Sequence, residues 1–279
     1  MTLDIVKSTG LPRDSRLPRV PLTDHQHMLI SWLVPVVLIL MWEAASRMGL
    51  ITPQVLPAPS SVAKTGWTLI VSGTLLEHLG ASLARAIAGF AIGGGIGFGL
   101  GVVVGFSRLA ESLLDRTVQM IRAIPFLALL PLVIVWFGVD EPGKIFLVSL
   151  AVMFPIYINT VLGIRQVDPK LLELARVTGL SRMETVRRIV LPGAMPSILT
   201  GVRYSLATAW LALVIAETVA TTRGIGFLAM DAREFLQTNV IILTVLIYAA
   251  IGVGADGIAR TLERHLLGWH PNYAKGGRK

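Results

Sequence analysis

The chain has 279 residues, of which 53% are hydrophobic and only 15% are charged, and its mean hydropathy is +0.69. A soluble domain carries about 25% charged residues, so this composition excludes an ordinary soluble protein and indicates an integral membrane protein. The net charge of +8 does not by itself indicate nucleic acid, because basic residues of membrane proteins gather on their cytoplasmic side. The absence of cysteine excludes disulfides, thiolate catalysis and cysteine-based metal sites.

Six runs with little or no charge predict six transmembrane helices. The uncharged runs 86–107, 145–164 and 235–255 are each long enough to cross a bilayer, which takes about 20 helical residues. Three shorter runs become long enough to cross once flanking residues are added. The first of them extends past Glu43 and Arg47, which stand one helical turn apart and can pair. The predicted spans are 28–50, 84–107, 118–139, 144–164, 198–222 and 235–257.

The distribution of basic residues orients these spans. With both termini in the cytoplasm, 19 of the 25 Lys and Arg residues lie on the cytoplasmic side, as the positive-inside rule requires. The alternative of a cleaved signal peptide in the first run is disfavoured by a long leader with three Asp residues. The predicted organisation is a cytoplasmic N-terminal segment 1–27, a transmembrane domain 28–262 containing a cytoplasmic loop 165–197, and a cytoplasmic C-terminal tail 263–279.

Two spans have unusual compositions. The second carries a glycine at every fourth position, namely Gly89, Gly93, Gly97, Gly101 and Gly105. One helix face therefore lacks side chains and permits close approach of another helix, which we expect within the chain, with a subunit interface as the alternative. The third and fourth spans are interrupted by Pro125, Pro131 and Pro155. Such breaks are typical of helices that line a path.

Ionisable side chains are scarce inside the predicted spans. Glu217 falls near the outer end of the fifth span. Arg85, Arg122 and Arg203 fall at or near span ends, where we expect them to anchor helices at the membrane interface rather than line the path. The pattern predicts no buried carboxylate relay of the kind that ion-driven pumps use, which places the energy source in another chain.

The segment 138–144, GVDEPGK, fits the G-x-x-x-x-G-K form of a phosphate-binding loop. Ile145 follows it in place of Ser or Thr, and Asp140 and Glu141 would repel phosphate, so we predict no nucleotide site here. The five His residues lie outside the predicted spans and form no metal-ligand pattern. We therefore predict no catalytic residue, metal or cofactor in this chain.

The loop 165–197 carries strong signals for local helix ends. Asp168 followed by proline starts a helix, and Gly179 stops it. Ser181, with a glutamate three residues on, opens a second helix through a capping box, and Pro192 follows its predicted end. The loop is therefore predicted to be two short helices joined by a tight turn.

A DNA-binding helix-turn-helix has the same spacing of a small residue and a glycine, here Ala175 and Gly179. Because the segment is tethered between two membrane spans, it cannot readily enter a major groove, and we predict no nucleic-acid partner. A rigid knob presented to a protein partner fits better, with the small Ala175 side chain permitting close approach.

The pattern of this loop resembles the "EAA" loop of permease subunits of bacterial ABC importers, in the binding-protein-dependent transport family. Within that family, the similarity to aliphatic sulfonate permeases extends from about residue 30 to 273, including the blocks LPGAMPSILTGVRYSL and HPNYAK. Leu174 stands where the family pattern often has Ala. The resemblance implies an ATPase-coupling site formed by Glu173, Ala175, Gly179, Leu180, Ile189, Leu191 and Pro192.

The same resemblance implies the assembly and its location. Two copies of this chain would form the pathway in the bacterial inner membrane, two cytoplasmic ABC ATPases would bind below, and a periplasmic binding protein would deliver substrate from outside. The implied fold is an all-α type I importer permease with cytoplasmic coupling helices, and the implied cargo is a small organic anion, foremost an aliphatic sulfonate.

Three alternatives stay open from the sequence. Permeases for taurine or nitrate look similar, and selectivity in such systems is set largely by the binding protein. An autonomous secondary transporter would need intramembrane charge, which is scarce here. A membrane enzyme would need a catalytic cluster, which the pattern does not offer. No substrate-binding residue is predicted.

Overall fold

The computed structural model describes residues 24–219 and 221–269, and side chains from residue 30 onward. These residues form helices and connecting turns, with no strand in the described part of the chain, which confirms the prediction of an all-α protein. The helices are α1 (Asp24–Arg47), α2 (Pro59–Val71), α3 (Thr74–Phe106), α4 (Arg108–Ala110), α5 (Arg116–Arg122), α6 (Phe126–Phe137), α7 (Glu141–Arg165), α8 (Pro169–Val177), α9 (Arg182–Thr185), α10 (Leu191–Val219), α11 (Ile225–Glu234) and α12 (Thr238–Leu266). Single π-helical turns join α4 to α5 (Glu111–Asp115) and α9 to α10 (Val186–Val190).

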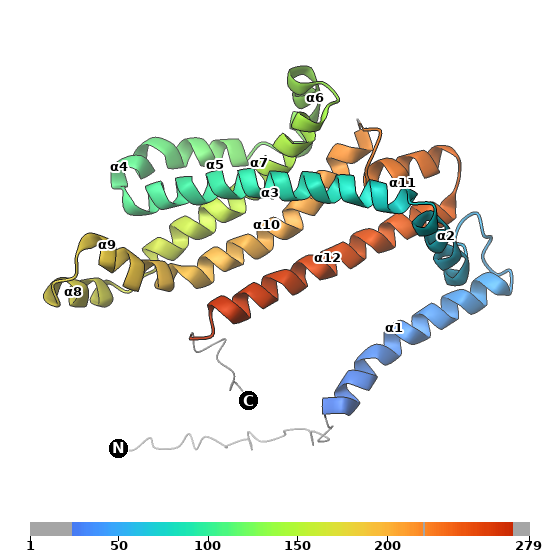
Figure 1. Cartoon of the computed structure of the whole chain (residues 1–279), viewed down its shortest axis with the longest axis horizontal. Helices are drawn as coiled ribbons and strands as arrows, with labels where there is room; N and C mark the ends of the chain where they lie inside the picture. The colour runs from blue at the N-terminus through green and yellow to red at the C-terminus, as the bar shows by residue number, and fades with distance from the viewer. Residues whose placement is uncertain (1–23, 220, 270–279) are drawn as a thin grey trace, which may run out of the picture.

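The central layer of the bundle consists of α3, α7 and α10, which run side by side (Figure 1). The glycine stripe of α3 faces α7, because a side chain on Gly93 would overlap the backbone of Ser149 and one on Gly97 would overlap the backbone of Met153. The close contact expected of this stripe therefore lies within the chain. Small residues allow this approach because no side chains separate the two backbones.

An apolar core lies between α7 and α10. Val148, Val152 and Ile156 of α7 pack against Leu213 of α10, and all four are at most 4% exposed. The Ser205 hydroxyl of α10 donates a hydrogen bond to a carbonyl of α7 at 3.0 Å, which ties the two helices together across this core. Burial of these branched side chains stabilises the pair by roughly 1.5–3 kcal/mol per residue relative to exposure in water.

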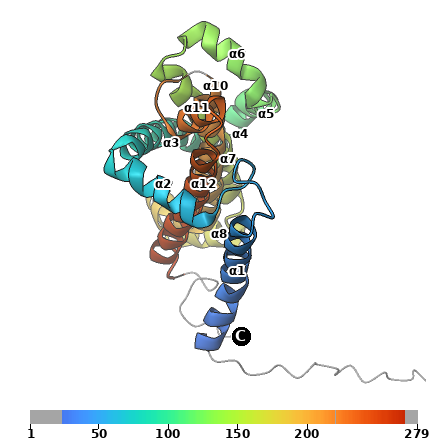
Figure 2. The ribbon, with the colours of Figure 1, turned by 90° about the vertical axis from the view of Figure 1, so that its right-hand side faces the viewer.

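The third predicted span, 118–139, is bent in the structure. The helical segment 108–122 and α6 meet at 95°, across a break of three residues that contains Pro125. Proline has no N–H to continue the helix and disfavours helical backbone at the residue before it, which accounts for the break. Both views place α6 away from the axis of the bundle (Figures 1 and 2).

The first helix stands apart from the bundle. The candidate span 30–47 of α1 is almost wholly unburied, with Ser46 near its end as the exception, and Figures 1 and 2 both show it separated from α3, α7 and α10. Its end is fastened to α2, where the Glu43 carboxylate accepts hydrogen bonds from the Arg47 guanidinium at 2.5 Å and the Ser60 hydroxyl at 2.7 Å. The predicted pairing of Glu43 with Arg47 is thus confirmed, and Ser60 extends it to a second helix.

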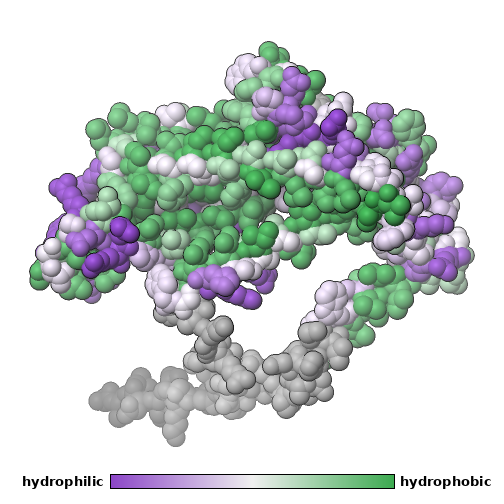
Figure 3. Space-filling view, in the orientation of Figure 1, coloured by the Kyte–Doolittle hydropathy of each residue, from purple (hydrophilic) through white to green (hydrophobic). Residues whose placement is uncertain are grey.

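The surface has the layout expected of a membrane protein. Five described helices are long and apolar enough to cross a membrane, or six when the bent pair counts as one span. In Figure 3 apolar side chains cover the middle of the bundle, and hydrophilic side chains gather at the end with α8 and α9 and at the opposite end near α2 and α11. The bundle therefore presents a lipid-facing belt between two polar ends.

Candidate functional site

The predicted loop 165–197 folds as a helical elbow at one end of the bundle (Figure 1). Asp168 caps α8 by accepting a hydrogen bond from the Lys170 N–H at 2.9 Å. Gly179 has φ +71°, a left-handed conformation that suits glycine, and it ends α8. Ser181 and Glu184 form the predicted capping box at the start of α9. These local predictions are confirmed.

The predicted coupling residues occupy both faces of this elbow. Glu173 and Gly179 are exposed at its tip, and Leu191 is 39% exposed where α10 begins. The remaining members are half-buried or buried in the chain, namely Leu180, Ile189, Pro192 and Ala175. The elbow therefore separates them into an outward-facing set and a set that holds its shape.

Ala175 belongs to the inward set. It is only 1% exposed, so the expectation that its small side chain permits close approach of a partner protein is wrong. Its carbonyl accepts the Leu180 N–H at 2.9 Å, which closes the turn after α8. The small side chain is needed because this face of α8 is covered by the chain itself.

Pro192 does not end the second short helix, which is a further correction. The helix continues from α9 through the π-helical turn Val186–Val190 into α10, giving one helical stretch of 38 residues, Arg182–Val219. A π turn widens the backbone by one residue, and this accommodates a proline ring that would otherwise clash with the carbonyl four residues earlier. The elbow is therefore joined rigidly to a membrane helix.

The tip of the elbow exposes large apolar side chains, and the sequence pattern did not predict their exposure. Leu174 is 56% exposed, Val177 is 86% exposed, and Met183 is 67% exposed. We call these three residues the elbow tip. Exposed apolar residues on a polar end of a membrane protein are not covered by lipid, and such residues are typical of protein-interaction surfaces.

A buried ion cluster lies at the opposite end of the bundle and joins α3, α7 and α10. The Arg85 guanidinium donates to Glu217 at 2.7 Å and to both oxygens of Glu141 at 2.5 and 2.6 Å. Arg85 is 4% exposed and Glu217 is 1% exposed. Lys144 also donates to Glu141, at 3.3 Å, so two positive and two negative groups balance each other.

The same cluster fixes the loop that enters α11. Glu217 accepts hydrogen bonds from the Ser82 hydroxyl at 2.8 Å and the Gly226 N–H at 2.9 Å, and Arg85 donates to the Arg223 carbonyl at 2.6 Å. A side chain on Gly224 would lie 2.5 Å from the Glu217 carboxyl. Residues 223–226 are therefore fitted closely around this carboxylate.

The expected role of Arg85 as a membrane-interface anchor is wrong, because its guanidinium is buried in ion pairs. The sequence offered one usable signal, a glutamate in an otherwise apolar span, since a buried carboxylate needs a positive partner. Arg203 also has partners, because it pairs with Asp256 of α12 at 2.6 Å. Arg122 lies at the bend between α5 and α6.

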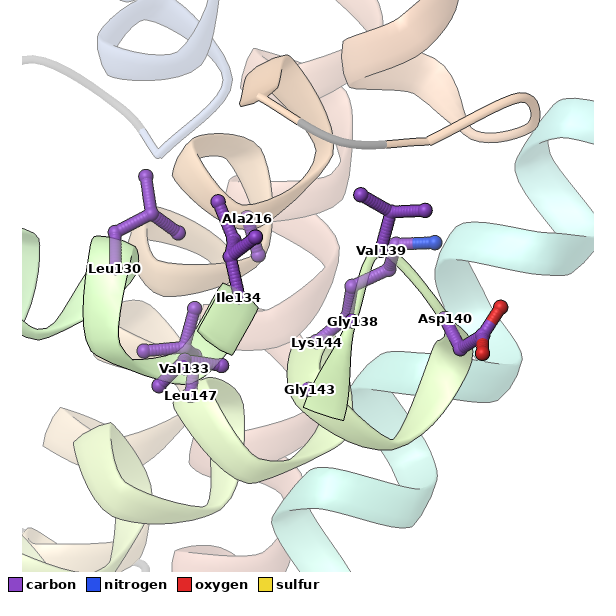
Figure 4. Close-up of a pocket in the computed structure, with 10 residues that line it drawn as sticks. All are labelled: Leu130, Val133, Ile134, Gly138, Val139, Asp140, Gly143, Lys144, Leu147 and Ala216. Atoms are coloured by element: carbon purple, nitrogen blue, oxygen red, sulfur yellow. The ribbon is translucent and has the colours of Figure 1, made fainter. Parts of the chain in front are cut away.

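The segment GVDEPGK forms the connection between α6 and α7 and the first turn of α7, and it does not resemble a phosphate-binding loop (Figure 4). Lys144, which would have to reach a phosphate, is 6% exposed and donates to Glu141. The adjoining cavity, lined by Val133, Leu147 and Ala216 among others, measures about 20 Å³, room for about one water molecule. The described residues contain no group of three or more potential metal ligands.

These features define a polytopic membrane protein, and comparison with known proteins places it in a transport family. Residues 93–268 match the family described as "binding-protein-dependent transport system inner membrane component". The chain belongs to this family, as the resemblance of its loop predicted.

Curated relatives agree with this assignment. The chain is 50% identical to the putative aliphatic sulfonates transport permease protein SsuC of Escherichia coli, over 87% of this chain and 92% of that protein. It is 44% identical to the protein of the same description from Bacillus subtilis, over 86% and 87%. The taurine transport system permease protein TauC of Escherichia coli is 35% identical over 84% of this chain and 87% of that protein.

Solved structures support the fold. The chain aligns with a chain of an amino acid ABC transporter at a TM-score of 0.58 and 18% identity, over 73% of this chain and 97% of that chain. It aligns with a chain of the inward-facing MetNI methionine ABC transporter at a TM-score of 0.51 and 22% identity, over 71% and 98%. The prediction of a type I importer permease fold is confirmed.

Proposed function

We propose that this chain is the membrane-spanning subunit of an ATP-driven importer for aliphatic sulfonates, and that the helical elbow docks onto a separate cytoplasmic ATPase. Two ATPase subunits, a periplasmic binding protein and a second copy of this chain complete the assembly. Both termini lie in the cytoplasm of this multi-pass inner-membrane protein. The observation that carries the docking proposal is the apolar elbow tip on an otherwise hydrophilic end of the bundle.

The substrate assignment is supported by the order of similarity among the relatives. Both relatives named for aliphatic sulfonates exceed 40% identity over most of the chain. The taurine permease stands at 35%, and a bicarbonate permease of Synechococcus elongatus at 37% over only 67% of this chain. Taurine is itself a sulfonate, so it is the second candidate substrate.

The mechanism follows from the rigid connection between the elbow and α10. The elbow tip inserts into a groove of the ATPase, and exposed Glu173 contacts its rim. When ATP draws the two ATPases together, the two elbows move with them. Because the helix is continuous from Arg182 to Val219, that movement tilts α10 and changes the side on which the pathway opens.

The experiment is co-purification of the ATPase with variants of this chain. Val177→Asp places a charge on the most exposed residue of the elbow tip and should lower ATPase recovery strongly, since interface centres are intolerant of such changes. Leu236→Asp is the matched control, because Leu236 is 85% exposed after α11 at the opposite end. Equal ATPase recovery with the two variants would contradict the docking proposal.

A further inference from the structure

A cavity of about 250 Å³ lies beside the bend between α5 and α6. The cavity reaches the middle of α7 and of α10, since Leu150, Pro155 and Thr208 are among the residues that line it. It therefore lies about midway between the two polar ends of the bundle. Its volume is below the roughly 300–1,000 Å³ of pockets for drug-sized ligands, which suits a small molecule.

Arg122 is the single charged residue among those lining this cavity. Arg122 is exposed, and its guanidinium forms no ion pair or hydrogen bond with any residue that the structure describes, unlike those of Arg85, Arg165 and Arg203, which all have carboxylate partners. An unpaired cation at this depth is unfavourable, and intramembrane ionisable residues of this kind mark substrate or ion pathways. Arg122 thus lacks a structural partner that would explain its presence.

Thr208 adds a hydroxyl to the same cavity. Pro155 has no N–H, so the Ala151 carbonyl loses its usual helix partner, and the Thr208 hydroxyl lies 3.3 Å from that carbonyl. The hydroxyl also lies 3.2 Å from two carbonyls of its own helix. Its one hydrogen can be donated to only one acceptor at a time, and a sulfonate oxygen is a stronger acceptor than any of these carbonyls.

The other walls of the cavity are apolar, and the first residue of α6 takes part in them. The apolar lining comes from α5–α6, α7 and α10 and includes Ile124, Phe126, Leu150, Phe154, Ile158 and Leu211. The N-terminal end of α6 carries a partial positive charge from its unpaired N–H groups, which adds to the charge of Arg122. One end of the cavity is therefore positive, and the rest is suited to hydrocarbon.

We propose that this cavity is the transit site for the cargo within the membrane, with Arg122 and Thr208 holding the oxyanion of an organic anion and the apolar walls holding its alkyl chain. The inference rests on the proposed function, and it assigns the substrate site that the sequence did not reveal. A guanidinium presents paired N–H donors that match two oxygens of a sulfonate. A single cation, with no second positive side chain lining the cavity, binds such an anion weakly enough to release it.

The test is sulfonate uptake by the complete transporter in proteoliposomes, measured together with ATP hydrolysis stimulated by the loaded binding protein. Arg122→Gln is expected to lower uptake at least about tenfold, the loss that fits one charge-assisted hydrogen bond. Stimulated ATP hydrolysis should stay within about twofold of the original protein, because the elbow and the outer surface are unchanged. Arg122→Lys should recover part of the uptake.

Arg116→Gln is the matched control, since Arg116 lies on the same helix and is exposed like Arg122 but does not line the cavity. Leu211→Phe narrows the apolar wall and should reduce uptake of octanesulfonate more than that of methanesulfonate. This second variant keeps the charge, so it decides the question even when Arg122→Gln assembles poorly.

The outcomes separate the two proposals. Uptake by Arg122→Gln within twofold of the unaltered protein, or equal effects of Leu211→Phe on both sulfonates, overturns the transit site and leaves the importer in place. Absence of sulfonate uptake by the unaltered assembly overturns the proposed function and the transit site with it.

Discussion

Replacing Glu217 by alanine removes the carboxylate on which three donors converge, those of Ser82, Arg85 and Gly226. Breaking a buried ion pair by removing one partner costs about 3–5 kcal/mol. Arg85 keeps its bonds to Glu141 and to a backbone carbonyl, so we expect a free energy of unfolding lower by about 3 kcal/mol, near the bottom of that range.

The assay is unfolding in mixed micelles with increasing denaturing detergent, followed by helical circular dichroism. The matched control is Glu77→Ala, because Glu77 pairs with Arg223 at the same end of the molecule, at 3.4 Å and with both side chains more than half exposed. That exposed pair should contribute about 0–1 kcal/mol. Glu217→Gln keeps one oxygen that can accept from two of the donors, so its loss of stability should fall between those of Glu217→Ala and Glu77→Ala.

A loss of stability in Glu217→Ala no greater than in Glu77→Ala would refute the reasoning. It would mean that the carboxylate is solvated or unpaired in the membrane-embedded protein. A double-mutant cycle with Arg85→Ala gives the direct reading, since the coupling energy of the pair should exceed about 1 kcal/mol.

Three further predictions concern the elbow and the glycine stripe. Gly179→Asp should uncouple ATP hydrolysis from uptake while the protein still inserts into the membrane. Gly179→Asn, whose side chain tolerates the left-handed backbone without adding a charge, should retain more uptake. Normal stimulated hydrolysis and uptake in the Asp variant would contradict this. Glu173→Gln should weaken the binding free energy of the ATPase by about 0.2–1 kcal/mol, with the larger loss at low salt. ATPase recovery equal to that of the unaltered protein at every salt concentration would count against this. Gly93→Leu should lower the free energy of unfolding by about 1–3 kcal/mol or more, because the new side chain meets the backbone of Ser149. Gly95→Leu is the control: it has open space around it and should have little effect in the same unfolding assay.

The helix ends of the elbow could be predicted from the sequence because their causes are local. A cap acts on N–H groups two or three residues away, as Asp168 and Ser181 do, and a left-handed turn needs only its own glycine, Gly179. Helix continuity was predicted less well. Pro192 reads as a stop, but a π turn absorbs it, and such a turn has no simple sequence signal.

The buried ion cluster and the elbow tip depend on contacts that the sequence does not reveal. Arg85 and Glu217 are 132 residues apart, and only the packing of α3 beside α10 brings them to 2.7 Å. Likewise, Leu174 and Ala175 are adjacent apolar residues of α8, yet one is 56% exposed and the other 1%. The difference arises from the face that the elbow turns toward the rest of the chain.

The bend at Pro125 had the largest effect on the candidate site. Counting uncharged residues predicted one span over 118–139, interrupted by proline, because length and hydropathy do not show whether the chain changes direction. Pro125 signalled a break, but the angle of 95° between the two helical segments depends on how α6 packs against α7. This bend places Arg122 beside the centres of α7 and α10.

The most direct test of the importer assignment is ATP hydrolysis by this chain assembled with its ATPase in lipid discs. The assembly is titrated with binding protein loaded with an alkanesulfonate, taurine, nitrate or bicarbonate. We predict tight association with the ATPase and the strongest stimulation by the alkanesulfonate-loaded form. Failure of the ATPase to associate, or stimulation by nitrate or bicarbonate alone, would contradict the account.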